Sequence, residues 1–435
     1  MKKIKFIDLF AGMGGTRVGF ENACRKLGVK SECVFTSEIK PYAVQIYQHN
    51  FNDDKVHGDI TQVDEKKMPD FDFLLGGFPC QAFSTAGKKA GFDDARGTLF
   101  FDVARILKEK KPKGFLLENV EGLVVHDRDS RSHEMGNTLK TILEILDDIG
   151  YKASWKVLDA KKFGVPQSRK RIYIVGSLDK EIQLEGFETK SKVFGDIQEE
   201  GLPPLETNFT SKLLEIYTPD ELEGKSIKDK RGGSSNIHSW DLELKGKLSS
   251  RQKEIMNLLL RERRKKKWAE IKDIAWMDGM PLTLDEIYSF YDFIDIDELR
   301  ELLDDMVEKK YLRFEHPKDL VVSSTGSRKR EYKVSSEKGY NIVTGKLSFE
   351  LNRILGKDCI APTIVATEAD RIGVIDSGKI RRMSERECLR FFGFPESYSS
   401  NIKHNELYDL IGNTVVVSVI EAVAKKTLEQ CLTIS

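Results

Sequence analysis

The sequence lacks a surplus of charge and long apolar runs, and each absence excludes a class of protein. Its 435 residues contain 70 Lys and Arg against 70 Asp and Glu, so the formal net charge at pH 7 is zero. Bulk charge therefore does not indicate a nucleic-acid partner. No apolar stretch is long enough to span a bilayer, and the apolar run near the N-terminus is too short for a secretory signal. We expect a cytoplasmic protein without a membrane partner.

Paired cysteines are also absent. The six cysteines lie far apart, with no CxxC pair and no Cys/His cluster. This spacing predicts neither a metal site nor a disulfide framework and fits a reducing compartment. Hydrophobic residues make up 40% of the chain and aromatic residues 9%, so a sizeable core is available. The length predicts a large domain with a second unit.

Apolar runs alternate with helix-like segments in the first 180 residues. We expect strands at 4–10, 33–37, 71–75 and 114–118, helices at 16–27, 42–50, 99–110 and 138–149, and a closing strand pair at 156–159 and 171–175. Such alternation predicts an α/β fold, a doubly wound parallel sheet with helices on both faces. Two further helices are expected near the end of the chain, at 383–392 and 414–428.

The pattern changes after about residue 178. We expect loops and irregular structure up to residue 246, because this stretch is polar and shows little period. Helices at 251–267 and 296–309, followed by strands at 311–314 and 331–334 that pair as a hairpin, resemble a winged-helix unit. The basic run 261–267 is read equally well as a solvated helix end or as a phosphate-contacting surface. Residues 273–308, by contrast, hold about a dozen acids and one arginine.

Glycines follow the first strand directly, in the run from Phe10 to Gly15. Such a turn lets the backbone pass close to a ligand that lies over the strand ends. Glu38 closes the second strand, where an acid bonds ribose hydroxyls, and Asp59 lies at a third expected strand end. Together these features favour a nucleoside-containing ligand. They do not decide between NAD and S-adenosylmethionine, which share adenosine.

A second group of residues has reactive side chains. Cys80 follows an apolar strand in a Pro-Cys turn, and the glycine-rich segment 84–97 after it suits a lid. Glu118 ends another apolar strand, where burial lets a carboxyl hold a proton near neutral pH. Arg169 and Arg171, at period two, suit a phosphate or a carbonyl oxygen.

Five blocks in this order resemble the motifs of the DNA (cytosine-5) methyltransferases: 10–15, 77–81, 118–120, 167–171 and 412–415. Segments 96–100 and 386–388 are also similar to blocks of that family. The resemblance covers about 4–176 and 382–424. It implies a doubly wound, Rossmann-like S-adenosylmethionine-dependent domain in 1–180 and 380–435. The inserted, smaller target-recognition region is then 181–379, with the winged-helix-like unit at about 248–340.

The resemblance also implies a chemistry without a metal. Cys80 would add to carbon 6 of a cytosine flipped out of the DNA duplex, and Glu118 would hydrogen-bond or protonate ring nitrogen 3. Asn119 would hold the geometry. Arg171, with Arg169 nearby, would bind the base carbonyl oxygen or the adjacent phosphate.

The implied cofactor is S-adenosylmethionine. Its expected contacts are Phe10, Gly12, Gly14, Glu38, Ile39, Asp59, Ile60, Pro79, Leu99, Asn413 and Val415. Expected DNA contacts are Gln81, Ser84 and Arg96 beside the lid, and Arg263, Arg264 and Lys265 in the basic run.

These residues lead to one hypothesis and three alternatives. The hypothesis is a bacterial, nucleoid-associated, monomeric modification methyltransferase that protects a short double-stranded DNA sequence from a cognate restriction endonuclease. A tRNA cytosine-5 methyltransferase has the same motifs. A catalytically silent DNA-binding protein on this fold is disfavoured by the intact Cys80 and Glu118. An NAD-dependent oxidoreductase leaves those two residues unexplained.

Overall fold

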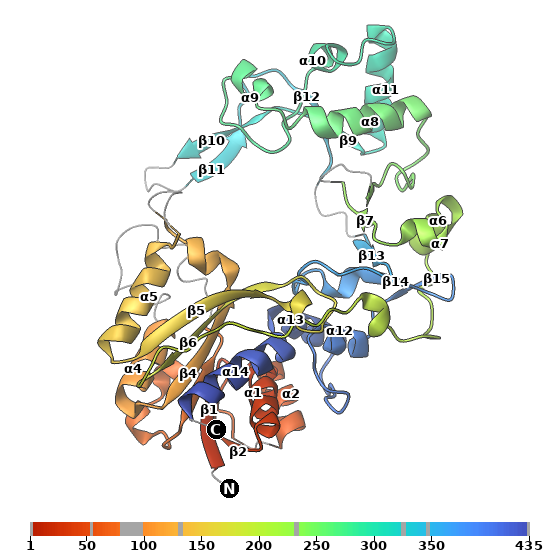
Figure 1. Cartoon of the computed structure of the whole chain (residues 1–435). Helices are drawn as coiled ribbons and strands as arrows, with labels where there is room; N and C mark the ends of the chain where they lie inside the picture. Colours follow the sequence, from red (N-terminus) through yellow and green to blue (C-terminus); the bar gives the residue numbers. More distant parts are fainter. Residues whose placement is uncertain are drawn as a thin grey trace. The chain divides into compact units, whose positions relative to one another are not determined.

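The computed structural model describes residues 3–52, 55–78, 99–128, 134–229, 235–322, 328–344 and 349–432. The chain divides into two compact units (Figure 1). Unit 1 comprises residues 1–200, 357–370 and 383–435, and unit 2 comprises residues 201–356 and 371–382. Residues 181–200 and 357–370, which the sequence assigned to the inserted region, therefore belong to unit 1, while residues 380–382, expected in the catalytic domain, belong to unit 2.

Unit 1 is built on a six-stranded sheet in the order β2-β1-β3-β4-β6-β5. The strands are β1 (Lys3–Leu9), β2 (Lys30–Ser37), β3 (Phe73–Gly76), β4 (Gly114–Val120), β5 (Lys152–Asp159) and β6 (Lys170–Ser177). The first four are parallel, while β6 runs antiparallel to both β4 and β5. The sequence predicted this parallel core and its closing strand pair correctly.

Helices cover both faces of this sheet (Figure 1). They are α1 (Gly15–Lys26), α2 (Pro41–Phe51), α4 (Leu99–Lys110), α5 (Asn137–Asp148), α12 (Glu385–Phe391), α13 (His404–Asn413) and α14 (Val417–Cys431). On one face, the ring of Phe20 in α1 lies 4.8 Å from that of Phe6 and 5.6 Å from that of Phe73. On the other, Ile7 and Leu74 belong to the buried cluster that includes residues of α4 and α5. The alternation of side chains along each strand thus builds two cores.

The C-terminal helix α14 packs closely on α1. A Cβ at Gly19 would lie 2.6 Å from Cγ2 of Ile420 and 2.8 Å from the carbonyl oxygen of Val417, so only glycine allows this approach. Tyr398 donates a hydrogen bond of 2.5 Å to the carbonyl oxygen of Met13. The last segment of the chain therefore completes unit 1.

The described helices give no membrane span on their own. No single one of them is long and apolar enough to cross a bilayer. The bent pair of helices α13 and α14 together has the length and composition of a membrane span. Its apolar side chains, such as Leu407 and Ile420, are fully buried in unit 1.

Unit 2 contains a five-stranded sheet in the order β15-β14-β13-β7-β8. Its strands are β7 (Ser226–Ile227), β8 (Asn236–Ile237), β13 (Arg353–Leu355), β14 (Ile372–Asp376) and β15 (Lys379–Arg382). The expectation of irregular structure up to residue 246 was wrong for two segments, which form the helices α6 (Asn208–Ile216) and α7 (Pro219–Leu222). Helix α6 is capped by Thr207, which accepts a hydrogen bond from Thr210 N. Its nine residues are too few for a clear helical period.

The rest of unit 2 has the element order of a winged helix. Its elements are α8 (Ser250–Glu262), α9 (Lys267–Ile271), α10 (Leu284–Tyr288), α11 (Ile296–Glu308), β9 (Leu312–Glu315), β10 (Lys318–Val322), β11 (Arg328–Tyr332) and β12 (Gly339–Ile342). An isolated bridge joins Leu282 to Tyr340, β9 pairs with β12, and β10 pairs with β11 as a hairpin between them. We call this hairpin the wing.

Two expectations for this part were wrong. The helix predicted for 251–267 stops at Glu262, because the chain turns there and buries the side chain of Arg263. The strand predicted near 311–314 pairs with 339–342 and not with 331–334. Burial decides this pairing, since Tyr340 and Ile342 enter the core of the winged-helix part while β11 stays exposed.

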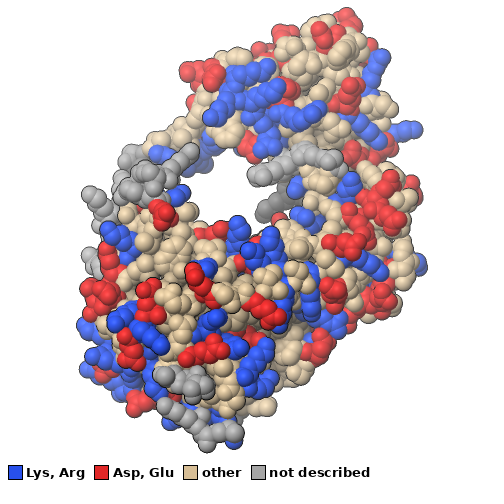
Figure 2. Space-filling model, in the orientation of Figure 1, with Lys and Arg blue, Asp and Glu red and all other residues tan. Residues whose placement is uncertain are grey.

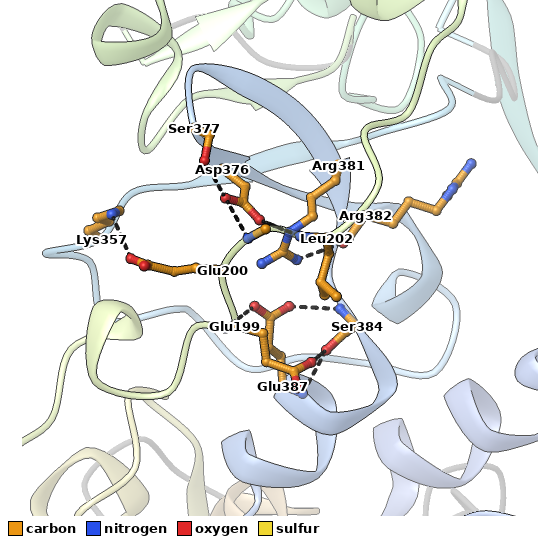
Figure 3. A network of polar contacts seen from close by, with 11 residues as sticks. Glu199, Glu200, Leu202, Lys357, Asp376, Ser377, Arg381, Arg382, Ser384 and Glu387 are labelled. Carbon is orange, nitrogen blue, oxygen red and sulfur yellow. Dashed lines mark hydrogen bonds and ion pairs between the residues drawn. The ribbon is translucent and has the colours of Figure 1, made fainter.

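Each unit also has a buried polar network (Figure 3). In unit 2, Nε of Arg381 donates to Oδ2 of Asp376 over 2.9 Å, and this hydrogen bond lowers the pKa of Asp376 to about 2. In unit 1, the carboxylate of Glu387 accepts from the backbone N–H groups of Glu199 and Ser384, over 2.8 and 2.7 Å. These bonds fix where the chain leaves and re-enters each unit.

Candidate active site

The turn after β1 is held in a left-handed conformation. Phe10, Gly12 and Gly14 have φ values of 56°, 54° and 81°. A Cβ built at Gly12 would meet nothing within 4 Å, whereas one at Gly14 would lie 2.3 Å from Cε2 of Phe51. The two positions therefore hold glycine for different reasons. Gly14 is required by packing, while the backbone at Gly12 borders open space.

Glu38 joins this turn to the end of β2. Its Oε2 accepts from Gly12 N over 2.7 Å, and its Oε1 accepts from the N–H groups of Ile39 and Lys40 over 2.8 and 2.9 Å. Ile39 beside it is 69% exposed although it is apolar. A fixed carboxylate next to an open apolar surface suits the sugar and base of a nucleoside.

Three other residues expected to contact the cofactor are Asp59, Ile60 and Leu99. The expected strand end at 58–60 is a single bridge from Ser37 to His57 followed by a short 3-10 helix, Ile60–Gln62. Asp59 is exposed, and its Oδ1 accepts from the N–H and hydroxyl of Thr61 over 2.9 and 2.8 Å. Ile60 is buried, and Leu99 begins α4.

Glu118 and Asn119 end β4 as the sequence predicted. The side chain of Glu118 is 12% exposed, and its Oε1 lies 3.2 Å from Nε of Arg171. Burial raises the pKa of Glu118, and the positive charges of Arg171 and Arg169 offset this only in part. The carboxyl thus keeps its proton to a higher pH than an exposed glutamate does.

Asn119 fixes the backbone that leads to the expected nucleophile. Its Nδ2 donates to the carbonyl oxygen of Phe78 over 2.9 Å, and its Oδ1 accepts from Val120 N over 2.8 Å. Phe78 is the last described residue before 79–98. The expected site residues Pro79, Cys80, Gln81, Ser84 and Arg96 lie outside the described residues.

The structure gives Arg169 a different task from the expected substrate contact. Its side chain is 3% exposed, and it donates to the carbonyl oxygens of Ile364, Gly412 and Thr414 over 3.0, 3.1 and 2.9 Å. Burial lowers its pKa to about 10, so it stays charged at neutral pH. Arg169 therefore holds distant segments of unit 1 together and positions its neighbours.

Arg171, by contrast, keeps part of its side chain exposed beside Glu118. It is 16% exposed, its Nη1 donates to the carbonyl oxygen of Lys170, and its Nε faces Glu118. Its Nη2 has no partner among the described residues. That nitrogen is a donor for a bound group.

The two C-terminal cofactor candidates differ in exposure. Val415 is 8% exposed, and a Cβ at Gly15 would lie 2.9 Å from its Cγ2, so it contacts the start of α1 beside the glycine turn. Asn413 is exposed, and its Nδ2 donates to the carbonyl oxygen of Asp409 in its own helix.

One titratable residue of the site was missed by the sequence analysis. Asp8 lies at the end of β1, is fully buried, and accepts a hydrogen bond of 2.8 Å from the hydroxyl of Thr16. Its Oδ2 is buried without a hydrogen-bond partner among the described residues. Burial raises its pKa to about 7. An acid inside an apolar strand, two residues before Phe10, was the available signal.

The three residues of the basic run that were expected to contact DNA have partners within unit 2. Arg263 is 3% exposed and donates to Oδ1 of Asn341 over 2.7 Å, which corrects the prediction that it contacts DNA. Arg264 pairs with Asp278, and Lys265 pairs with Glu262. Arg264 and Lys265 are therefore paired with acids inside unit 2, and Arg263 is buried, so none of the three is left as an uncommitted surface cation.

Comparison with known proteins places the chain in a family. The model of the C-5 cytosine-specific DNA methylases matches residues 4–429. The type II methyltransferase M.NlaIV of Neisseria lactamica is 54% identical over 428 residues, which cover 98% of this chain and 99% of the relative. M.HgiCI of Herpetosiphon aurantiacus is 40% identical over 448 residues, covering 97% and 96%. The solved structure of S. pombe Dnmt2 methyltransferase, at 16% identity, a TM-score of 0.51 and 99% coverage of both chains, shares the fold.

Proposed function

Because the chain belongs to the family of C-5 cytosine-specific DNA methylases, we propose that it methylates carbon 5 of cytosine within a short double-stranded DNA sequence. The observation that carries this proposal is the pair of Glu118 and Arg171. A buried carboxyl whose pKa is raised and a guanidinium with an unused donor stand next to the backbone fixed by Asn119. Such a pair suits a ring nitrogen and the neighbouring carbonyl oxygen of cytosine.

S-adenosylmethionine is the cofactor of this proposal, and the residues around the glycine turn fit it. The open space at Gly12 admits a ligand against the backbone, the carboxylate of Glu38 suits ribose hydroxyls, and the exposed side chain of Ile39 suits a base. When bound, S-adenosylmethionine would supply an activated methyl group. Val415 and Leu99 would border the same space, and Asp59 would accept from an amino group.

Cys80 is the proposed nucleophile, by its match to the family motif. Its thiolate would add to carbon 6 of cytosine, and the electron pair would move to nitrogen 3, which takes a proton from Glu118. Carbon 5 becomes nucleophilic and would take the methyl group from the sulfonium of S-adenosylmethionine, which would be left as the neutral thioether. Transfer of the proton on carbon 5 to solvent then expels the thiolate, and the proton on nitrogen 3 returns to Glu118. Arg171 would bind the carbonyl oxygen of the base throughout.

The target base lies inside the duplex, so it must flip out before Cys80 can reach it. Flipping costs a few kcal/mol. Gln81, Ser84 and Arg96, next to the nucleophile in the sequence, are proposed to contact the strand and fill the gap.

We further propose that the protein is the modification enzyme of a bacterial restriction-modification system. Its relatives M.NlaIV and M.HgiCI are named type II methyltransferases. A cognate endonuclease would share the DNA site without having to bind this protein. The enzyme would act as a monomer on DNA in the bacterial cytoplasm.

Expression in a host without cytosine methylation, followed by bisulfite sequencing, tests the function. We expect unconverted cytosines within one short motif. Complete conversion of the DNA together with methylated tRNA would instead support the tRNA methyltransferase. For the nucleophile, wild-type protein should form a covalent complex with DNA that carries 5-fluorocytosine in that motif, and Cys80→Ala should not. A complex that persists in the variant would exclude Cys80.

A further inference from the structure

The wing of unit 2 has two faces of different charge. The pairing of β10 with β11 sets Lys318 opposite Tyr332, Leu320 opposite Arg330 and Val322 opposite Arg328. Because side chains alternate across a strand, these six share one face, which we call the basic wing face. Its six residues include three cations and no acid, and the hydroxyl of Tyr332 at its edge donates to the carboxylate of Glu315 over 3.0 Å. The other face carries Asp319, Val321, Lys329 and Glu331.

The basic wing face is both anchored and open. Arg330 donates to the carbonyl oxygens of Ala275 and Trp276 over 3.1 and 2.8 Å, which ties the hairpin to the rest of unit 2. Val322 is 57% exposed and Tyr332 is 48% exposed. Tyr332 also lies under the ammonium of Lys318, which is 4.6 Å from the centre of its ring. A rigid aromatic and basic surface of this kind is typical of nucleic-acid contacts.

Arg328 is the least committed cation of this face. It is exposed, and no ion pair of its guanidinium is found among the described residues. On the opposite face, Lys329 pairs with Glu331 at 3.4 Å. Arg328 is therefore free to neutralise a phosphate at little cost in broken contacts.

Positive charge continues at the base of the wing. A cavity of about 230 Å³ lies there, and its charged lining consists of the cations Arg263, Arg313 and Lys318 and the acids Asp278 and Glu315. Figure 2 shows Lys and Arg side chains gathered over the part of unit 2 that holds α9 and β12. Lys318 belongs both to this cavity and to the basic wing face, so the two surfaces are continuous.

Helix α11 has the opposite character. It occupies the place in the element order where a winged helix has its groove-reading helix. Leu299, Leu303 and Met306 are buried, and the exposed acids are Asp297, Glu298, Glu301, Asp304 and Glu308. Arg300, the helix's one basic residue, pairs with Asp297. Phosphates would be repelled by this surface.

We propose that unit 2 meets duplex DNA through the basic wing face, and that α11 faces away from the DNA. A two-stranded ribbon fits the major groove as well as a helix does. Lys318 and Arg328 bind phosphates, and Tyr332 and Val322 supply contact area. This inference rests on the proposed DNA substrate.

Two matched charge reversals test it. The wing variant is Lys318→Glu/Arg328→Glu, and the control is Arg300→Glu/Lys310→Glu, which makes the same change in charge around α11. The probe is a fluorescein-labelled duplex with the motif mapped by bisulfite sequencing, titrated at about 50 to 200 mM salt. We expect the wing variant to bind about tenfold or more weakly and to lose about two units of the salt slope. The control should stay within about threefold of wild type.

Equal weakening by the two variants would overturn the wing assignment, as would an unchanged affinity of the wing variant. Thermal unfolding and the KM for S-adenosylmethionine should be unchanged in both variants. If the thermal unfolding or the KM of the wing variant changes, the variant Lys318→Gln/Arg328→Gln is tested in its place, with the same expected outcomes. Methylation by the wild-type protein of a plasmid that contains the motif is measured in parallel. Its presence confines a negative result to the wing, while its absence rejects the proposed function and this inference together.

Discussion

Nε of Arg171 lies 3.2 Å from Oε1 of Glu118, at the ends of the neighbouring strands β6 and β4. The guanidinium opposes the effect of burial on the carboxyl, yet the pKa of Glu118 is still raised. Burial is therefore the stronger influence. The pair thus combines a carboxyl of raised pKa with a nearby positive charge, which by itself would lower that pKa.

Glu118→Gln should lower kcat about a hundredfold or more while the affinity for S-adenosylmethionine stays unchanged, because only proton transfer is lost. The pH profile provides the sharper measurement. The acid form acts in wild type, so its rate should fall as the pH rises through the raised pKa of Glu118. The variant should lack that decline. A decline of the same shape in the variant would assign it to another group.

Arg171→Lys and Arg169→Lys should separate catalysis from stability. The first should lower kcat about a hundredfold and change the free energy of unfolding by less than about 1 kcal/mol. The second leaves buried carbonyl oxygens without donors and should cost about 2–4 kcal/mol of stability. Thermal or denaturant unfolding and single-turnover kinetics measure the two effects. The reverse order would contradict the roles assigned to these arginines.

Gly12→Ala and Gly14→Ala should also differ. The methyl group at Gly12 meets open space, so the cost in stability is about 1–2 kcal/mol from backbone strain. It should raise the KM for S-adenosylmethionine about tenfold or more by filling the proposed site. At Gly14 the methyl group meets Phe51, so about 2–4 kcal/mol of stability should be lost. An unchanged KM in Gly12→Ala would move the cofactor away from this turn.

Asp8→Asn should remove a pH dependence of stability. The pKa of Asp8 is raised to about 7 in the folded protein, so the folded state gains from its proton at low pH. That contribution is lost as the pH rises through about 7. Wild type should therefore lose about 1.4 kcal/mol more than the variant between about pH 6 and pH 8. Parallel stability curves for the two proteins would show that Asp8 is ionised throughout.

The sequence predicted the strands of unit 1 and the positions of Glu118 and Asn119 because local rules decide them. The central strands are buried on both faces and read as continuous apolar runs, so a polar residue that follows one marks the ligand edge of a parallel sheet. Asp8 broke such a run and was overlooked only because the glycines after it formed the stronger pattern.

Arg169 and Arg263 could not be interpreted in the same way. Each lies in a run of similar basic residues, and nothing local distinguishes the buried member from its neighbours. The partners of Arg169 are carbonyl oxygens of Ile364 and Gly412, about two hundred residues further on. The predicted pairing of 311–314 with 331–334 was wrong for the same reason, since burial of Tyr340 in the core of the winged-helix part decided it.

The packing of α14 on Gly19 affects how the protein is made. The groove on α1 that receives Ile420 is synthesised near the start of the chain, and its occupant emerges near the end. At about 5–20 residues per second, the ribosome needs on the order of 20 to 80 s to bridge that interval. During this time the nascent chain presents an unfilled apolar groove. Chaperone binding to stalled chains should therefore persist until α14 leaves the exit tunnel, even when the inserted unit has already folded.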